Sequence, residues 1–290
     1  MPGKLTAMKI SLTGAGRIGS AIAFSLSKAG HDVTVVARGA RYDYLRRHGA
    51  IVTTQGDSAP VTTVSSLLAD VAYDIVIVTV PEYKVETLLP QLSLCAAKTV
   101  LFMFNTFRGC DPYRAAVGEE RFAFGFPNMA ASLDKHRLRF SANGSGMVTT
   151  LTEQGLVRIF ENAGLPAEYE TDMDAFLRSH VALAVPLFLS ALKTWDRDYN
   201  LTWHEAREFE KVWNIGFAVV KSLGHPFRPK MTEILSRMPS LIRAAFLWVF
   251  SRTKIVRQTG AFGPEESRWL LDDMVAASPV LAAELKLLRP

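Results

Sequence analysis

The sequence predicts an α/β fold with a doubly wound parallel sheet, followed by an all-helical second domain. Through the first half of the chain, short apolar runs alternate with helical patterns, and long helical patterns replace them after about residue 170. Alternation of this kind is typical of strands connected by helices in a parallel sheet. We therefore expect one domain at residues 1–170 and another at 171–290, since domains usually span roughly 100–200 residues.

Four near-continuous apolar runs are expected to form the central strands. They are MKISLT (8–13), VTVVA (33–37), IVIVTV (75–80) and TVLFMF (99–104). Runs without polar alternation are typical of strands covered by helices on both faces. Between the first two runs, Ile18, Ile22 and Leu26 recur on one helix face, and Gly30 follows as the helix end. Further strands are expected at 121–126, 146–150 and 167–171.

Long helices are expected in the second domain at 176–192, at 204–222 and from Gly263-Pro264-Glu265-Glu266 onward. The second of these ends where glycine and proline follow in LGHP. The amphipathic stretch PSLIRAAFLWVFSR (239–252) is expected to be ordinary core. A pocket lining and a dimer face are the alternatives for it.

Composition narrows the class of protein. The net charge of +5 is spread along the chain and no nucleic-acid motif is present, so no nucleic-acid partner is expected. Cys95 and Cys110 have no metal-ligand spacing and are expected as free thiols, with no bound metal. The start of the chain has no apolar signal region, and the apolar run 181–192 is short and contains Pro186. We expect a cytoplasmic protein without a membrane partner.

The stretch SLTGAGRIG (11–19) contains three glycines, Gly14, Gly16 and Gly19, between a strand and a helix. In a Rossmann-type unit, the first glycine permits a tight turn, the second admits a pyrophosphate and the third allows close helix packing. Arg17 and Ile18 lie in the same loop and are also expected to contact the cofactor. The alternative is a glycine-rich turn without a ligand.

The end of the second strand distinguishes NAD from NADP. NAD sites usually carry an acid there, which binds the ribose hydroxyls. Here the strand ends at Arg38, Arg41 follows, and Asp32 lies at the wrong end. A pair of guanidinium groups matches a 2′-phosphate, which predicts NADPH. The alternative is two solvated loop arginines.

Other candidate cofactor contacts follow the later strands, because ligands of such sheets lie beyond the strand carboxyl ends. Thr79, Pro81 and Lys84 follow one strand, and Asn105 follows the next. The amide of Asn105 is expected to orient a nicotinamide or a substrate carbonyl. An ordinary asparagine turn or helix cap is the alternative.

These residues resemble the ketopantoate reductases (2-dehydropantoate 2-reductases) over most of the chain. The resemblance rests on KISLTGAGRIGSAIAFSLSKAGHDVTVVAR, DIVIVTVPEYKVETLLPQL, the asparagine of FNTFRG, and VVKSLGHPF. It implies NADPH-dependent reduction of a 2-oxo acid to a 2-hydroxy acid, with a step toward pantothenate as the default assignment. It also places Gly14, Gly16, Gly19, Arg38 and Asn105 at the family's cofactor-binding positions.

The chain departs from the family at two positions. The family's catalytic lysine, in a K-[LF]-x-x-N pattern, corresponds to His180 in RSHVALA, and the asparagine corresponds to Ala184. The family's acidic residue, in a T-E-[IV]-D-like run, corresponds to SRTKIVRQTG (251–260), which has Lys254 and no carboxylate. In the family this acidic residue binds the hydroxyl of the substrate. Because Arg252, Lys254 and Arg257 occupy this stretch instead, we expect a substrate that lacks this hydroxyl.

Hydride addition to a ketone needs a proton donor, and histidine can replace lysine in this role. His180 is therefore expected as the catalytic acid in its imidazolium form, and Asn105 as a hydrogen-bond donor. Arg178 and Ser179 are expected to hold a carboxylate and orient the ring. The alternative for His180 is a core histidine. At the level of function, the alternatives are opine-dehydrogenase-like reductive amination and a non-catalytic NADP(H) sensor. The expected partners are a small 2-oxo acid and a second copy in a homodimer.

Overall fold

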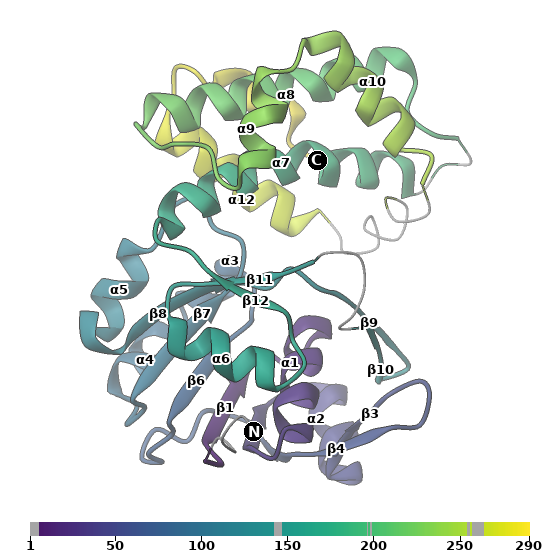
Figure 1. The fold of residues 1–290 in the computed structure, drawn as a ribbon. Coiled ribbons are helices and arrows are strands. Elements are labelled where there is room, and N and C mark those ends of the chain that lie inside the picture. Colours follow the sequence, from purple (N-terminus) through teal and green to yellow (C-terminus); the bar gives the residue numbers. More distant parts are fainter. Residues whose placement is uncertain (1–5, 142–146, 196, 198, 254–255, 257–263) are drawn as a thin grey trace. The chain divides into compact units, whose positions relative to one another are not determined.

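The computed structural model describes residues 6–141, 147–195, 197, 199–253, 256 and 264–290. The chain divides into two compact units (Figure 1). Unit 1 comprises residues 1–104 and 110–173, and unit 2 comprises 105–109 and 174–290. The five residues 105–109 thus belong to the helical unit, although they follow a strand of the other unit. The sequence gives no indication of this exchange.

Unit 1 is built on a sheet of eight strands in the order β12-β11-β8-β7-β6-β1-β2-β5. The strands are β1 (Lys9–Thr13), β2 (Asp32–Val36), β5 (Thr62–Val64), β6 (Ile75–Val78), β7 (Thr99–Met103), β8 (Phe122–Phe126), β11 (Thr149–Leu151) and β12 (Ala167–Tyr169). The four central strands expected from the sequence are confirmed. The sheet is parallel from β5 to β8, whereas β11 pairs antiparallel with β8 and parallel with β12. The expectation of a parallel sheet therefore holds for its central part only.

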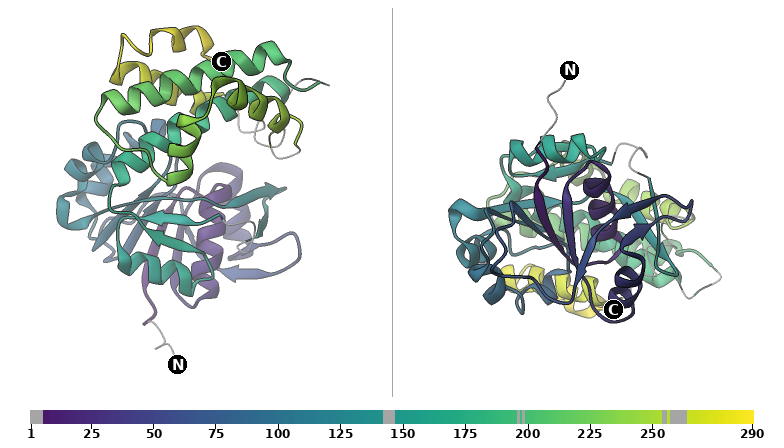
Figure 2. Two further views of the ribbon diagram at one scale, coloured as in Figure 1. Left: turned by 45° about the horizontal axis from the view of Figure 1, so that its top comes forward. Right: turned by 90° about the horizontal axis from the view of Figure 1, so that it is seen from below.

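Helices cover both faces of this sheet (Figure 2). They are α1 (Arg17–Lys28), α2 (Gly39–His48), α3 (Glu82–Val85), α4 (Leu89–Leu94), α5 (Asp111–Val117) and α6 (Gln154–Asn162). On one face, Ile22 of α1 and Phe160 of α6 pack with Leu101 of β7 in a single buried cluster. On the other face, the next strand residue, Phe102, contacts Tyr113 of α5 at 5.2 Å between ring centroids. This doubly wound arrangement was predicted.

Two small antiparallel sheets complete unit 1. One joins β3 (Ala50–Val52) to β4 (Ser58–Pro60), and the other joins β9 (Ala130–Asp134) to β10 (Arg137–Ser141). Neither was predicted from the sequence. The turn of the second hairpin places Lys135 and His136 at positive φ angles, 44° and 71°, where glycine is the usual residue.

Unit 2 is helical in its described part. Its helices are α7 (Met173–Trp195), α8 (Trp203–Ser222), α9 (Lys230–Arg237), α10 (Ser240–Phe250) and α12 (Glu265–Ala277), followed by a 3-10 helix at Ala283–Leu288. The expected helices at 176–192 and 204–222 are confirmed within α7 and α8. The third expected helix is α12. Gly263, which opens the predicted start signal, lies outside the described residues.

Helix α7 is long and apolar enough to cross a membrane by length and composition. However, 67% of its most apolar window is buried inside the protein, as in the core helix of a globular unit. Val181, Val185 and Leu189 lie on one side of α7 and belong to the same buried cluster as Trp213 of α8. The burial of α7 is therefore accounted for by the core of unit 2.

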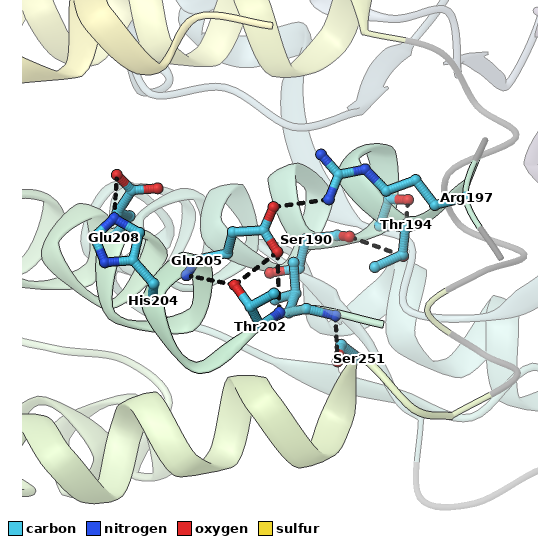
Figure 3. Close-up of polar contacts among 10 residues, drawn as sticks. Ser190, Thr194, Arg197, Thr202, His204, Glu205, Glu208 and Ser251 are labelled. Carbon is cyan, nitrogen blue, oxygen red and sulfur yellow. Dashed lines mark hydrogen bonds and ion pairs between the residues drawn. The ribbon is translucent and has the colours of Figure 1, made fainter. Parts of the chain in front are cut away.

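The start of α8 is fixed by a capping box (Figure 3). The Thr202 hydroxyl accepts a hydrogen bond from the Glu205 N–H, and the Glu205 carboxylate accepts one from the Thr202 N–H. Arg197 adds an ion pair to Glu205 at 2.7 Å. Burial alone would raise the pKa of Glu205, but these hydrogen bonds and the Arg197 charge outweigh it and lower the pKa.

Helix α10 contradicts the expectation that 239–252 is core. Leu241 is 59% exposed, Ile242 54% and Val249 57%, whereas the inward side of the helix carries Arg243, Ala244 and Leu247. The sequence pattern places apolar residues almost all around this helix, so periodicity could not show which side faces the protein.

Candidate functional site

The glycine loop between β1 and α1 is shaped by two close approaches. Gly14 has φ +114°, and a Cβ there would lie 2.7 Å from Thr79 Oγ1. A Cβ on Gly19 would lie 1.9 Å from the Gly14 carbonyl oxygen. No side chain fits at such distances. The fold itself therefore requires glycine at positions 14 and 19.

Gly16 differs from its two neighbours in the motif. It is exposed, and a Cβ built on it would meet no atom within 4 Å among the residues that the structure describes. Its φ of −72° suits any residue. Packing therefore does not explain the glycine here, but close approach of a ligand to the backbone does. This open cradle fits the pyrophosphate of a dinucleotide.

The helix that follows the loop suits an anion. Gly16 occupies the N-cap position of α1 and has no side chain to cap the helix, and the first turn contains no acid. The N–H groups and the positive end of the helix dipole favour a phosphate at such a terminus. Ile18 packs partly against the core of unit 1, and Arg17 is half-buried. Ile18 therefore contributes to the packing of unit 1, in addition to its expected contact with the cofactor.

Thr79 supports the loop from the end of β6. Its hydroxyl lies 2.9 Å from the Gly14 carbonyl oxygen, to which it donates a hydrogen bond. Pro81 is half-buried and precedes the four-residue helix α3. Lys84 is exposed, with its Nζ 5.4 Å from the Tyr83 ring centroid. Thr79 therefore holds the glycine loop in shape, which is a different role from the direct cofactor contact we expected.

The two arginines after β2 are not equivalent. Arg41 donates to the carbonyl oxygens of Ala15 (3.1 Å) and His136 (2.6 Å) and to the Ser20 hydroxyl (2.7 Å). Burial lowers the pKa of Arg41. It ties the glycine loop to the β9–β10 turn, and this engagement argues against the phosphate role that we expected for it.

Arg38, in contrast, is exposed at the N-cap of α2. Within the described part of the chain, its guanidinium makes no hydrogen bond or ion pair. It is thus the member of the arginine pair that is available to a 2′-phosphate.

Asn105 directly follows the Phe104 that ends the first segment of unit 1, and it is hydrogen-bonded within unit 2. Its Nδ2 donates to Glu266 Oε1 at 2.7 Å. Its Oδ1 is buried and has no hydrogen-bond partner among the described residues. We expected this amide to donate, but the carboxylate already engages the amide nitrogen. The atom that Asn105 leaves unsatisfied is an acceptor, suited to the amide of a nicotinamide or to a hydroxyl.

The segment 105–109 is held by two helices of unit 2. Arg108 forms an ion pair with Asp273 of α12 at 3.0 Å, and Arg178 of α7 donates to the Arg108 carbonyl oxygen at 2.8 Å. Because Glu266 and Asp273 are seven residues apart, they lie on one side of α12. That side therefore fixes both Asn105 and Arg108.

His180 lies on α7 and is half-buried. Its ring stacks on Phe176, one turn earlier, at 6.2 Å between centroids. Burial lowers the pKa of His180 to about 4. The ring is therefore neutral near pH 7 in the free protein, whereas our expectation was an imidazolium. Transfer of the group out of water disfavours its charged form.

The two residues before His180 serve the protein itself. Arg178 forms an ion pair with Asp174 at 2.7 Å in addition to its bond to the segment 105–109. Ser179 is fully buried and accepts a hydrogen bond from the Arg228 N–H at 3.1 Å. These contacts argue against the expected roles in binding a substrate carboxylate and orienting the ring. Lys254 and Arg257, expected at the substrate end, lie outside the described residues.

Glu266 is the candidate that sequence reasoning missed. The resemblance places the family's acidic position within 251–260, whereas the carboxylate that contacts Asn105 is Glu266, in the first turn of α12. An acid at a helix start is common for reasons of helix stability alone. The contact spans 161 positions in the sequence, and no local pattern could have indicated it.

A predominantly parallel sheet with an open phosphate cradle at a strand carboxyl end is typical of a dinucleotide-binding unit of the Rossmann type. Residues 10–152 match the family model of the ketopantoate reductases, PanE/ApbA. This match identifies a ketopantoate reductase domain in residues 10–152, and the protein is an oxidoreductase. No curated protein sequence matches the chain.

Solved structures share this fold over nearly the whole chain. A PanE/ApbA family ketopantoate reductase from Ralstonia eutropha JMP134 is 21% identical, with a TM-score of 0.73 and coverage of 97% of this chain and 98% of that one. The 2-dehydropantoate 2-reductase from Methylococcus capsulatus is 19% identical, with a TM-score of 0.67 and 96% coverage of each chain. A D-mandelate dehydrogenase in complex with NADH is 16% identical, with a TM-score of 0.71 and 97% coverage of each chain. At these identities the likeness concerns the fold.

Two alanine substitutions should separate the packing role of the motif from its binding role. Gly16→Ala should leave the free energy of unfolding within about 0.5 kcal/mol of the wild type, because the site is open. It should nevertheless weaken pyridine-nucleotide binding, because a methyl group then occupies the cradle. Gly19→Ala should cost about 1–3 kcal/mol of stability through overpacking. Urea denaturation and fluorescence titration with NADPH measure the two effects. Equal losses of stability in both variants would contradict the assignment.

Proposed function

We propose that the protein is an NADPH-dependent reductase that converts a 2-oxo acid to a 2-hydroxy acid, of the ketopantoate reductase type. The observation that carries this proposal is the open glycine cradle of unit 1 in a chain whose residues 10–152 match that family. Asn105, Glu266 and His180, all of unit 2, are the proposed substrate and nicotinamide contacts. Ketopantoate is the first substrate to test, because it is the substrate named for several relatives of the same fold.

The choice of NADPH rests on Arg38. It is an exposed cation at the end of β2, where an NAD site would carry an acid. The D-mandelate dehydrogenase of the same fold has been solved with NADH, so the fold alone leaves the choice of nucleotide open. Arg38 supports the phosphorylated nucleotide by charge and by the fork geometry of its guanidinium.

Proton transfer is the step that the chain's own residues must perform. NADPH, when bound, supplies the hydride, and the developing alkoxide then needs a proton. We assign the proton to the His180 imidazole. The pKa of His180 lies near 4 in the free protein, so the ring must take up a proton before it can donate one during reduction. In the reverse reaction, oxidation of the hydroxy acid, the neutral ring can accept the hydroxyl proton. An anionic substrate nearby would raise the pKa of His180 and so favour reduction.

We further propose a cytoplasmic location and a step toward pantothenate as the physiological role. The location is supported by Cys95 and Cys110, which are buried thiols and not a disulfide, as is usual in a reducing compartment. The role in pantothenate formation is supported by the family match.

A substrate panel tests the proposed reaction. NADPH oxidation should be fastest with ketopantoate or another 2-oxo acid alone, and adding amino acids should not accelerate it. NADPH loss is followed by absorbance, and the product is identified by mass spectrometry. Turnover that depends on an added amine would show reductive amination instead. Tight NADPH binding without turnover of any 2-oxo acid would show a cofactor sensor.

Substitution of Arg38 tests the nucleotide preference. Arg38→Met should weaken NADPH binding by roughly 10- to 100-fold, because a charge-assisted hydrogen bond contributes about 1.5–3 kcal/mol. NADH binding should change little, because NADH lacks the 2′-phosphate. Arg41→Met is the matched control and should lower the affinity for both nucleotides, since Arg41 supports the loop itself. Calorimetric titration measures all four affinities. Equal losses for both nucleotides in Arg38→Met would refute the assignment.

The pH profile tests the role of His180. With a pKa near 4 in the free protein, the protonated fraction falls tenfold for each pH unit above that value. The kcat/KM for reduction should therefore decline with rising pH between about 5 and 8, whereas kcat/KM for hydroxy-acid oxidation should stay level. His180→Asn keeps a polar side chain but cannot titrate, so it should lose both the slope and most of the activity. Wild-type activity in His180→Asn, with NADPH affinity unchanged, would exclude this proton donor.

A further inference from the structure

The net positive charge of the chain is concentrated in two segments of unit 1. Residues 38–48 comprise Arg38 and α2, and residues 134–139 comprise the turn of the β9–β10 hairpin with the strand ends beside it. Together they contain seven arginines and lysines and two aspartates. Their net charge of +5 equals the formal net charge of the whole chain, so the remaining residues are neutral as a set.

The fold brings these two segments side by side (Figure 1). Arg41 of α2 donates to the His136 carbonyl oxygen at 2.6 Å, and the Tyr44 ring stacks on the His136 ring at 5.0 Å between centroids. The adjoining β3–β4 hairpin adds one acid, Asp57, and no cation. Helix α2 and the β9–β10 turn therefore form one continuous cationic surface.

We define the basic patch as the exposed cations of this surface other than Arg38, namely Arg46, Arg47, Lys135, Arg137 and Arg139. Arg46 donates a hydrogen bond to the Tyr42 hydroxyl at 2.9 Å. The side chains of the other four form no hydrogen bond or ion pair with any residue that the structure describes. Asp134 lies opposite Arg137 in the register of the hairpin, but the two form no ion pair. The protein thus leaves most of this charge without a counter-ion among the described residues.

The spacing of the patch suits a row of phosphates. In β10 the buried Leu138 alternates with Arg137 and Arg139, so these two side chains project from the same outer side, about 7 Å apart along the strand. Helix α2 is about 15 Å long, and Arg47 lies in its last turn. A nucleic-acid duplex carries one phosphate charge per about 1.7 Å of its axis, so several phosphates can face a surface of this extent.

We infer that the basic patch binds the phosphate backbone of a double-stranded nucleic acid, without regard to its sequence. Arginine suits phosphate because its planar guanidinium donates two parallel hydrogen bonds. Contacts to phosphate oxygens hold a protein on a duplex and carry no sequence information. The composition predicts no nucleic-acid partner because the charges are dispersed along the chain, whereas the fold gathers them. The inferred binding is separate from the proposed reductase activity, whose nucleotide contacts are Arg38 and the glycine loop.

The composition of the patch distinguishes a nucleic acid from a protein or a membrane. Residues 38–60 and 129–141, all of which the structure describes, contribute no exposed large apolar side chain. The centre of a protein–protein interface is normally apolar and poor in charge, and a helix that binds a membrane surface inserts an apolar side. Interfaces with nucleic acids are more polar and much more positively charged. The patch therefore matches the third kind of partner.

The aromatic rings beside the patch favour a duplex over a single strand. Tyr44 stacks on His48, at 4.1 Å between centroids, as well as on His136. Tyr42 lies beneath the Arg46 guanidinium, 5.8 Å from its ring centroid. Proteins that bind single strands present free aromatic faces on which the bases stack. Here the rings pack against neighbouring side chains, so the patch offers charge and not a stacking platform.

The test is binding of the full-length protein to short fluorescein-labelled duplexes of arbitrary sequence, one of DNA and one of RNA, followed by fluorescence anisotropy. Each phosphate neutralised contributes about −0.9 to the slope of log K against log salt. The four cations without a counter-ion should therefore give a slope of about −3.6, which is a loss of affinity of roughly 150-fold between about 50 and 200 mM salt.

Variants with fewer charges identify the surface. Arg137→Gln/Arg139→Gln removes two phosphate contacts and should halve the slope, to about −1.8, with an unchanged circular dichroism spectrum. Arg158→Gln/Lys211→Gln is the matched control, because it removes the same charge from exposed positions outside the patch. This control should keep the slope and the affinity of the wild type.

A second patch variant, Arg47→Gln/Lys135→Gln, lies on the helix and the turn and should have the same effect as the strand variant. The affinity for NADPH should be that of the wild type in both patch variants, because Arg38 is intact. The inference would be overturned by a wild type that binds neither duplex at about 50 mM salt, or by equal losses in the patch and control variants.

Three further results would reassign the patch. Tighter binding of a labelled single strand than of either duplex would contradict the assignment to a duplex. Binding of polyglutamate or of anionic phospholipid vesicles, lost in the patch variants and stronger than duplex binding, would assign the patch to an acidic protein or a membrane. Loss of NADPH affinity in the patch variants, with no duplex binding by the wild type, would assign the patch to the nucleotide cofactor.

Discussion

The close packing of the glycine loop on the end of β6 is the constraint on which the nucleotide unit depends. A Cβ at Gly19 would lie 1.9 Å from the Gly14 carbonyl oxygen, so the first turn of α1 packs on the loop too closely for any side chain. Thr79 and Arg41 then fix the loop with hydrogen bonds to the carbonyl oxygens of Gly14 and Ala15. Gly14, Ala15 and Gly19 are thus engaged with the protein, and the open backbone at Gly16 is the surface available to a phosphate.

A second constraint holds the proposed chemistry together. The segment 105–109 continues from a strand of unit 1, yet α12 of unit 2 binds two of its side chains and α7 binds the Arg108 carbonyl oxygen. Glu266 takes the amide nitrogen of Asn105, and the buried Oδ1 stays unsatisfied among the described residues. A buried acceptor without a partner costs free energy, which a ligand that donates a hydrogen bond would recover. The unsatisfied Oδ1 of Asn105 therefore favours a ligand with a hydrogen-bond donor at this position.

The predictability of the fold followed the strength of local patterns. Strands such as 75–78 are buried on both faces, so their apolar runs identify them, whereas β3 and β4 have only three residues each and leave no periodic signal. At the site, the glycines were predictable because their spacing reflects backbone geometry. The different roles of Arg38 and Arg41 were not, because they depend on acceptors at Ala15 and His136. The depressed pKa of His180 arises from tertiary burial, and Glu266 becomes relevant only through a partner 161 residues away.

The exchange of residues 105–109 has a consequence for how such a protein can diversify. The chain passes between the two units after Phe104, after Gly109 and after Met173, so no single cut separates them. If unit 2 were replaced by the helical domain of a relative, that domain would need an acceptor for the Asn105 amide and a carboxylate for Arg108. The two groups would have to be spaced as Glu266 and Asp273 are. Recombination at the apparent domain boundary would otherwise leave an arginine and an asparagine without partners. Specificity is thus expected to change by point substitution within unit 2 more readily than by its replacement as a block.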